Sequence, residues 1–294
     1  MNVLVDNTTD MWLPLYTIYA NEAHGPIYWV FRSLELFLYI PALVFVFFLC
    51  RIALKIKMFH INMTIIIVIA VSEHVEIIVA RLLFLPYQEG WITLADANYT
   101  LILNTKLDNM PRIDLSIKFL PLILAGYLRA HYVISMVTCL LMFVIERTIA
   151  SIWLVNYERK PRLYVSVTLV TTSHIFSSVV AYEAILNRVS YPQFIIPASI
   201  LSIAALILYC SLFVYNTRIQ EKMNSAGRNQ AYTLGKRFQA KENLRSLKLM
   251  SNVMIAVTLM MVINSFLLTS VIYHVVPNCL FTPFLSTFEA ILSL

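Results

Sequence analysis

The most informative part of this chain is the stretch 119–150, FLPLILAGYLRAHYVISMVTCLLMFVIERTIA. Residues 119–145 are mostly apolar, and the run is longer than the roughly 20 residues that a helix needs to cross a bilayer core. It ends in an adjacent acid and arginine, Glu146 and Arg147. Because an arginine keeps its charge, Arg147 must pair with an acid, reach water or enter a partner's surface. Arg147 could therefore occupy different places in two conformational states, as in a switch. Basic residues also flank spanning helices for topological reasons alone.

The composition agrees with a membrane protein. Hydrophobic residues make up 60% of the chain and charged residues 13%, which excludes a water-soluble globule with a polar surface. We predict an all-α, polytopic membrane bundle of seven helices that forms a single domain, residues 1–294. The expected spans lie near 28–50, 61–85, 117–145, 163–185, 192–215, 249–273 and 279–294.

The seventh expected span is short. A helix over residues 280–294 rises only about 22 Å, against a bilayer core of about 30 Å. We therefore expect a truncated seventh helix. A short isoform, a gene-model error and a decayed gene with a non-functional product are all consistent with this pattern.

The basic residues are distributed unevenly between the loops. Segment 1–27 contains no Lys or Arg, whereas the connection after the first span and loop 216–248 are rich in both. Because Lys and Arg stay on the cytoplasmic side, we predict an extracellular N-terminus and a cytoplasmic loop 216–248. Glycosylation sequons at Asn7 and Asn98 fall on the predicted outer side. The sequon at Asn62 falls on the inner side and should stay bare.

Several chemistries find no support in the sequence. The net charge of +6 comes from basic residues beside spans, where they set topology and meet anionic lipid, so we expect no nucleic-acid partner. His74 and Glu76 match only half of a zinc deaminase signature. No hydrolase motif or phosphate-binding glycine loop accompanies them. We therefore expect no metal, no cofactor and no enzymatic activity.

Ionisable side chains inside the spans carry further information, because each costs about 2.5–3.5 kcal/mol or more in lipid without a partner. Span two contains Glu73, His74 and Glu76, and span three contains Arg129 and His131. Helical rise puts Glu76 and Arg129 about 24 and 25 Å above the inner ends of their helices. We predict an ion pair of Arg129 with Glu76 or Glu73, and place His131 in a second layer. A ligand pocket, a structural lock and a proton or ion pathway are all consistent with this group.

Two loops allow a structural prediction. From Phe238, loop 216–248 reads as a helix that continues into span six, with Leu244 and Leu247 as an apolar edge. One face of this helix is basic, with residues at helical spacing: Arg237, Lys241, Arg245 and Lys248. Such a face suits a cytosolic partner or a lipid surface. The outer loop 86–118 either caps the bundle or is a disordered, glycosylated connection, and we favour the second reading.

Two blocks of residues resemble the nematode serpentine receptor class epsilon (Sre) chemoreceptors. The first is Glu146-Arg147-x-x-Ala150 with the downstream pair Tyr157-Glu158. The second is Tyr232-x-Leu234 with Arg237-Phe238-Gln239 and Glu242-Asn243-Leu244-Arg245-x-Leu247-Lys248. The second block is specific, because polar loop residues have no hydropathic reason to match.

The resemblance implies a G-protein-coupled receptor in the plasma membrane of a sensory cilium, which detects a small extracellular chemical. It implies that a heterotrimeric G protein meets Glu146, Arg147, Tyr157 and Glu158, with the basic helix beside them. It implies no particular ligand. A channel subunit of the insect type would have the opposite orientation. A transporter would be expected to show internal repeats, and a zinc hydrolase would need histidines gathered on one face, whereas here they are scattered one per helix.

Overall fold

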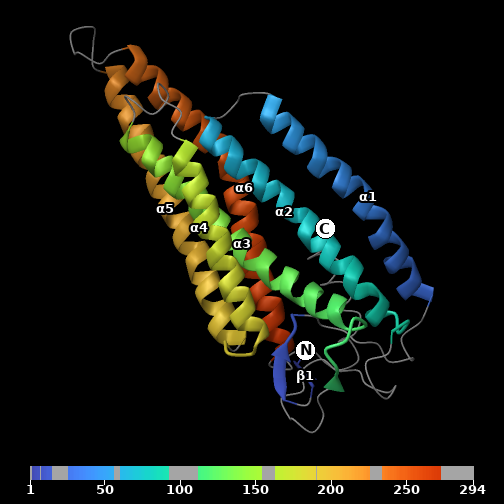
Figure 1. The fold of residues 1–294 in the computed structure, drawn as a ribbon. Helices are drawn as coiled ribbons and strands as arrows, with labels where there is room; N and C mark the ends of the chain where they lie inside the picture. The colour runs from blue at the N-terminus through green and yellow to red at the C-terminus, as the bar shows by residue number, and fades with distance from the viewer. Residues whose placement is uncertain are drawn as a thin grey trace.

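Long helices dominate the structure, a computed structural model that describes residues 2–6, 8–14, 26–55, 60–92, 112–153, 163–189, 191–225 and 234–272. The helices are α1 (Pro26–Lys55), α2 (Ile61–Gln88), α3 (Leu120–Ile152), α4 (Leu163–Ile185), α5 (Tyr191–Ser225) and α6 (Leu234–Ile272). Three short strands accompany them: β1 (Asn2–Val5), β2 (Thr9–Trp12) and β3 (Arg112–Ile113). Figure 1 shows the helices running side by side along one long axis.

Each of the six described helices is long and apolar enough to cross a membrane. Large apolar side chains point outward along their length, as Phe37, Phe45 and Phe47 do on α1. An apolar surface of this extent is typical of helices that face lipid. The predicted polytopic helical membrane bundle is confirmed in these helices, while the expected seventh span, 279–294, lies outside the described residues.

Helix α3 is the centre of the bundle, because it packs against α2, α4, α5 and α6, whereas α1 packs along α2 (Figure 1). Its apolar residues meet those of α2, α5 and α6 in the largest core, which includes Met63, Leu140, Phe143, Tyr209, Leu247 and Met254. A movement of α3 would therefore be felt by most of the bundle.

The strands cover one end of the bundle, called here the strand end. Strand β1 pairs antiparallel with β2 and parallel with β3, giving the order β2-β1-β3. Val3 and Val5 pack with Ile113 against Phe84 of α2 and Leu122 of α3. The favoured reading of loop 86–118 as disordered is wrong for residues 112–118, which form a strand and turns. Residues 93–111 of this loop lie outside the described part.

The opposite end, called here the basic end, is more helical than predicted. Helix α5 continues to Ser225 and α6 begins at Leu234, so most of the predicted loop 216–248 is helix. The predicted helix that continues into span six is confirmed, and it starts a few residues earlier than expected. At the strand end, α2 runs to Gln88 with Pro86 inside the helix, slightly beyond the expected limit of span two.

Candidate functional site

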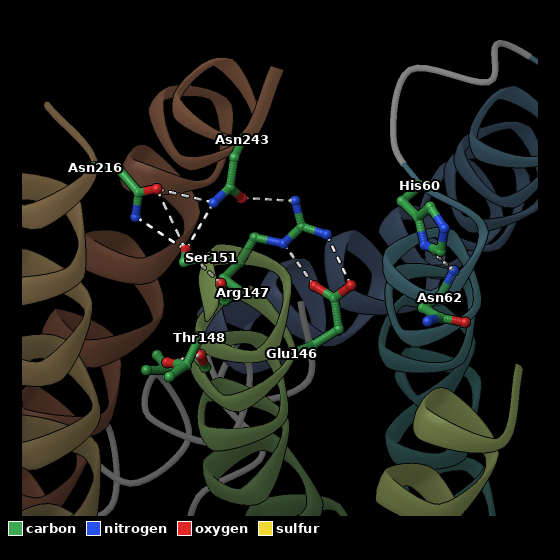
Figure 2. A network of polar contacts seen from close by, with 9 residues as sticks. His60, Asn62, Glu146, Arg147, Thr148, Ser151, Asn216 and Asn243 are labelled. Atoms are coloured by element: carbon green, nitrogen blue, oxygen red, sulfur yellow. Dashed lines mark hydrogen bonds and ion pairs between the residues drawn. The ribbon is translucent and has the colours of Figure 1, made fainter. Parts of the chain in front are cut away.

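A buried polar cluster lies at the basic end, where Glu146 and Arg147 lie in the last two turns of α3 (Figure 2). The Glu146 carboxylate accepts two hydrogen bonds from its neighbour Arg147, at 2.5 Å from Nε and 2.7 Å from Nη2. This bidentate pair is the strong geometry for a guanidinium and a carboxylate. The charge of Arg147 is therefore balanced within α3 itself.

Two asparagines join this pair to the neighbouring helices (Figure 2). Arg147 Nη1 donates to Asn243 Oδ1 of α6 at 3.2 Å. The Asn243 amide donates to Ser151 Oγ at 2.7 Å and to Asn216 Oδ1 of α5 at 3.0 Å. Asn216 in turn donates to Ser151 Oγ at 3.0 Å. These five residues, Glu146, Arg147, Ser151, Asn216 and Asn243, form the Arg147 cluster, which links α3, α5 and α6.

Sequence reasoning found Glu146 and Arg147 but missed three members of this cluster. Asn243 was part of a recognised block without a role, and Ser151 and Asn216 were not singled out. A usable signal existed, since Ser151 follows Arg147 by four residues and so lies on the same face of α3. An asparagine fully buried in a helix, such as Asn216, also needs a hydrogen-bond partner there.

A second polar cluster lies inside the bundle, between α2, α3 and α4. His131 Nδ1 is 2.9 Å from Glu76 Oε1, and Ser135 donates to Glu73 at 2.7 Å. His174 of α4 brings its Nε2 to 3.4 Å from Glu73 and stacks its ring on His131, with the ring centres 5.6 Å apart. We call these five residues, Glu73, Glu76, His131, Ser135 and His174, the intramembrane polar cluster.

The predicted ion pair of Arg129 is wrong. Glu76 contacts His131, and Glu73 contacts Ser135 and His174, so the expected second-layer residue is the actual partner of Glu76. The predicted depth of the partner on α3 was right, but the predicted partner lies on another side of that helix. Each residue turns an α-helix by about 100°, so Arg129 and His131 point about 160° apart. Arg129 is nevertheless buried.

The histidines are also less scattered than expected, since His131 and His174 stack on each other. His74 lies beside Tyr132 with ring centres 5.7 Å apart, and its Nδ1 is 3.3 Å from the carbonyl oxygen of Ala70. In the described part of the chain, no group of three or more His, Cys, Asp or Glu has the geometry to hold a metal.

A third cluster, near the strand end of α1 and α2, was not predicted. Arg81 Nε is 2.7 Å from Glu35 Oε1, and Arg32 also pairs with Glu35. Arg32 Nε is 2.7 Å from Glu89 Oε1, and Tyr39 donates to Glu35 at 2.5 Å. We call these five residues, Arg32, Glu35, Tyr39, Arg81 and Glu89, the strand-end charged cluster. The sequence contained a signal, because Glu35 and Arg81 each lie about 30 Å from the basic end of their helices.

The remaining predicted residues divide into two groups. On α6 the side chains of Lys241, Arg245 and Lys248 are exposed and that of Arg237 is partly buried, so the expected basic face is largely present. Four other residues lie outside the described part: Asn7, Asn98, Tyr157 and Glu158. Asn62, whose sequon is predicted to lie on the inner side, is buried, and its side chain accepts a hydrogen bond from Ser166 at 3.2 Å.

Comparison with known proteins identifies similar chains. The family model described as Sre G protein-coupled chemoreceptor matches residues 1–294. Serpentine receptor class epsilon-38 of Caenorhabditis elegans is 30% identical over 271 residues, which are 91% of this chain and 74% of that protein. Serpentine receptor class epsilon-45 of the same organism is 27% identical over 265 residues, 86% of this chain and 70% of that protein. No solved structure matches the chain. The resemblance seen in the two sequence blocks is confirmed.

Proposed function

We propose that this chain, which belongs to the Sre family of G protein-coupled chemoreceptors, detects a small extracellular chemical and activates a heterotrimeric G protein. The Arg147 cluster is the observation that carries this proposal. It joins α3, α5 and α6 at one end of the bundle, beside the exposed basic residues of α6. In a receptor of this kind, contacts between these helices would keep the surface that binds the G protein closed at rest.

The mechanism follows from the bonds of this cluster. At rest, Asn243 holds the basic ends of α5 and α6 against α3. A ligand that binds the open arrangement more tightly shifts the population toward it, by no more than its difference in affinity. The amide bonds then break, Arg147 leaves its buried position, and the guanidinium enters the G protein surface. The basic face of α6 contacts the same partner.

We assign ligand contact to the intramembrane polar cluster. Its carboxylates and imidazoles offer both donors and acceptors within a span, where polar residues commonly serve function. Glu76 and His131 join α2 to α3, and His174 adds α4. A polar group of the ligand that competes for these partners would loosen α3 from two neighbours. The same helix carries Arg147 at its other end.

The receptor reading requires an extracellular N-terminus and a plasma-membrane location, in keeping with a ciliary chemoreceptor. We expect glycans at Asn7 and Asn98, so that each Asn→Gln change removes one glycosidase-sensitive shift on a gel. We also expect a tag placed after Leu294 to be protected from external protease. Unglycosylated sequons with a cytoplasmic N-terminus would instead support a channel-like protein of inverted topology.

The decisive experiment measures G protein activation in cell membranes with a panel of Gα subunits. Because no ligand is identified, the cluster is opened by Asn243→Leu, which should raise basal activation. Adding Arg147→Ala should remove this gain, whereas adding Arg51→Ala, at an exposed arginine near the basic end of α1, should leave it intact. Equal activation with and without Arg147, at matched surface expression, would refute the switch.

A further inference from the structure

The intramembrane polar cluster opens sideways, between α2 and α4. The side chain of His174 is 34% exposed and that of Glu76 18%, although both residues lie in the middle of spanning helices. Ser72 and Val79 lie on the same side of α2 as Glu76, since they are four and three residues away, and both are exposed. Thr171, one turn from His174 on α4, is exposed too. We call these five residues the α2/α4 flank, through which the cluster is reached from the outside of the bundle.

This opening lies deep in the membrane. His174 is the middle residue of α4, eleven residues from Leu163 and eleven from Ile185. The helical rise is about 16 Å in each direction, which is about half the thickness of a bilayer core. An imidazole exposed at this depth meets hydrocarbon instead of water, which is costly unless a polar group covers it. The α2/α4 flank therefore suits an occupant that dissolves in the membrane and carries a polar group.

The charge of the cluster indicates which polar group fits. At both ends of the bundle, buried glutamates pair with arginines, whose charge is permanent. In the described part of the chain, Glu73 and Glu76 contact no Lys or Arg, and their basic neighbours are histidines. The rings of His131 and His174 stack with centres 5.6 Å apart, so that a charge on both is unfavourable. One imidazolium leaves two carboxylates with excess negative charge, which a cation would balance.

We propose that the intramembrane polar cluster binds an alkylamine that enters from the lipid along the α2/α4 flank. The ammonium takes the place of His131 as the partner of Glu76 and also meets Glu73, while the alkyl chain covers the exposed edge at Ser72 and Val79. A phospholipid head group does not fit, because it stays at the membrane surface, about 15 Å from this depth. This inference rests on the proposed function, since it names the chemical class of ligand for the cluster to which ligand contact is assigned there.

The amine reaches the cluster as the neutral base, because a charged form is costly in hydrocarbon. An alkylamine is more basic than an imidazole, so a protonated histidine of the cluster gives its proton to the amine nitrogen and is left neutral. The ammonium has three N–H donors, enough to bridge Glu73 and Glu76, which lie one turn apart on α2. Loss of the contact between Glu76 and His131 then loosens α2 from α3, as the proposed mechanism requires.

The first test measures binding independently of signalling. The full-length protein in phosphatidylcholine nanodiscs is melted with n-octylamine, or with 1-octanol, which has the same chain but no charge. Octylamine should raise the melting temperature of the wild type by several degrees, and octanol should not. Glu76→Gln should remove this shift, whereas Glu183→Gln, at a partly exposed glutamate of α4, should keep it. No shift in the wild type, an equal shift with octanol, or a full shift in Glu76→Gln refutes the site.

The second test blocks the route through the lipid. Ser72→Trp places a large ring at the edge of the α2/α4 flank and should remove the octylamine shift. Ile207→Trp, at an exposed position on α5, is the matched control and should retain the shift. A full shift in Ser72→Trp would mean that the amine does not enter along this flank, and would overturn the proposed route.

G protein activation separates this inference from the proposed function. Octylamine should raise activation in cell membranes, and Glu76→Gln should remove that response. If octylamine binds through Glu76 but leaves activation unchanged while the Arg147 switch works, an alkylamine is not the ligand class of the receptor and the inference is wrong. If Arg147→Ala does not reduce activation in the Asn243→Leu variant, the switch fails, and the melting shifts alone confirm or refute the amine site.

Discussion

Buried arginines mark both ends of the bundle, but they are held in different ways. Near the strand end, Arg81 pairs across helices with Glu35, and Arg32 shares the same carboxylate. At the basic end, Arg147 pairs with its own neighbour Glu146, and only neutral amides cross to α5 and α6. Ion pairs therefore join neighbouring helices near the strand end, whereas hydrogen bonds join them at the basic end.

The difference separates a permanent contact from a reversible one. Breaking a buried ion pair by removing one partner costs about 3–5 kcal/mol, because a charge is left uncompensated. A hydrogen bond to a charged group contributes only about 1.5–3 kcal/mol, and a neutral one about 0.5–1.5 kcal/mol. Separating α5 and α6 from α3 breaks these hydrogen bonds but no ion pair that the described residues form between these helices, so this step avoids the larger cost.

The largest effect is expected from Glu35→Gln. This change leaves Arg81 and Arg32 buried without the carboxylate that they share, and should destabilise the protein by about 3–5 kcal/mol. Thermal unfolding of the detergent-solubilised protein measures the loss. A variant that melts like the wild type would show that the strand-end charged cluster is no stronger than the Arg147 cluster, and the comparison would fail.

A smaller effect is expected from Glu146→Gln. Arg147 loses its carboxylate, but it lies near a helix end from which it can reach water, so the loss should be about 1–3 kcal/mol. Because the open state exposes the guanidinium, basal G protein activation should rise in this variant. Activation at or below the wild-type level, with normal surface expression, would show that the pair does not hold Arg147 in its closed position.

Asn216→Ala tests the weakest link between the helices of the Arg147 cluster. It removes the α5 partner of Ser151 and Asn243 but leaves the bond from Arg147 to Asn243. We expect a loss of about 0.5–1.5 kcal/mol and a modest rise in basal activation, below that of Asn243→Leu. The exposed Asn252→Ala on α6 is the matched control. A larger effect from Asn216 than from Asn243 would reverse the order of the two asparagines.

The smallest effect is expected at the exposed ion pair of Glu183 and Arg188, whose side chains are 3.2 Å apart. Exposed pairs contribute about 0–1 kcal/mol, so Glu183→Gln should leave the melting temperature nearly unchanged. The same substitution at Glu35 then differs mainly in burial. A comparable loss at both positions would mean that burial does not decide the strength of these pairs.

Much of the architecture was predictable because it depends on local properties of the chain. Apolar length located the spans, and helical spacing located the basic face of α6, which continues into span six. The contacts between helices were harder to predict from the sequence. The count of helical rise placed Glu76 at the depth of its partner on α3 but chose Arg129 instead of His131, because depth carries no information about the direction of a side chain around the helix.

The strand end escaped prediction for another reason. Strand β1 pairs with β3 across more than a hundred residues of sequence, and no local sequence pattern predicts such a contact. The approach of Leu13 to Gly126 is also non-local. By contrast, Glu35 and Arg81 were within reach of the sequence, since opposite charges at equal depth in neighbouring spans are expected to pair.

The length of α6 has a mechanical consequence. As an unbroken helix from Leu234 to Ile272 without an internal proline, it is about 58 Å long, nearly twice the thickness of the bilayer core. A tilt of about 5° around its strand-end tip would carry the other tip sideways by about 5 Å. Asn243 lies near the end of α6 that is far from this pivot, so a small tilt of the helix moves Asn243 further than it moves residues near the strand end.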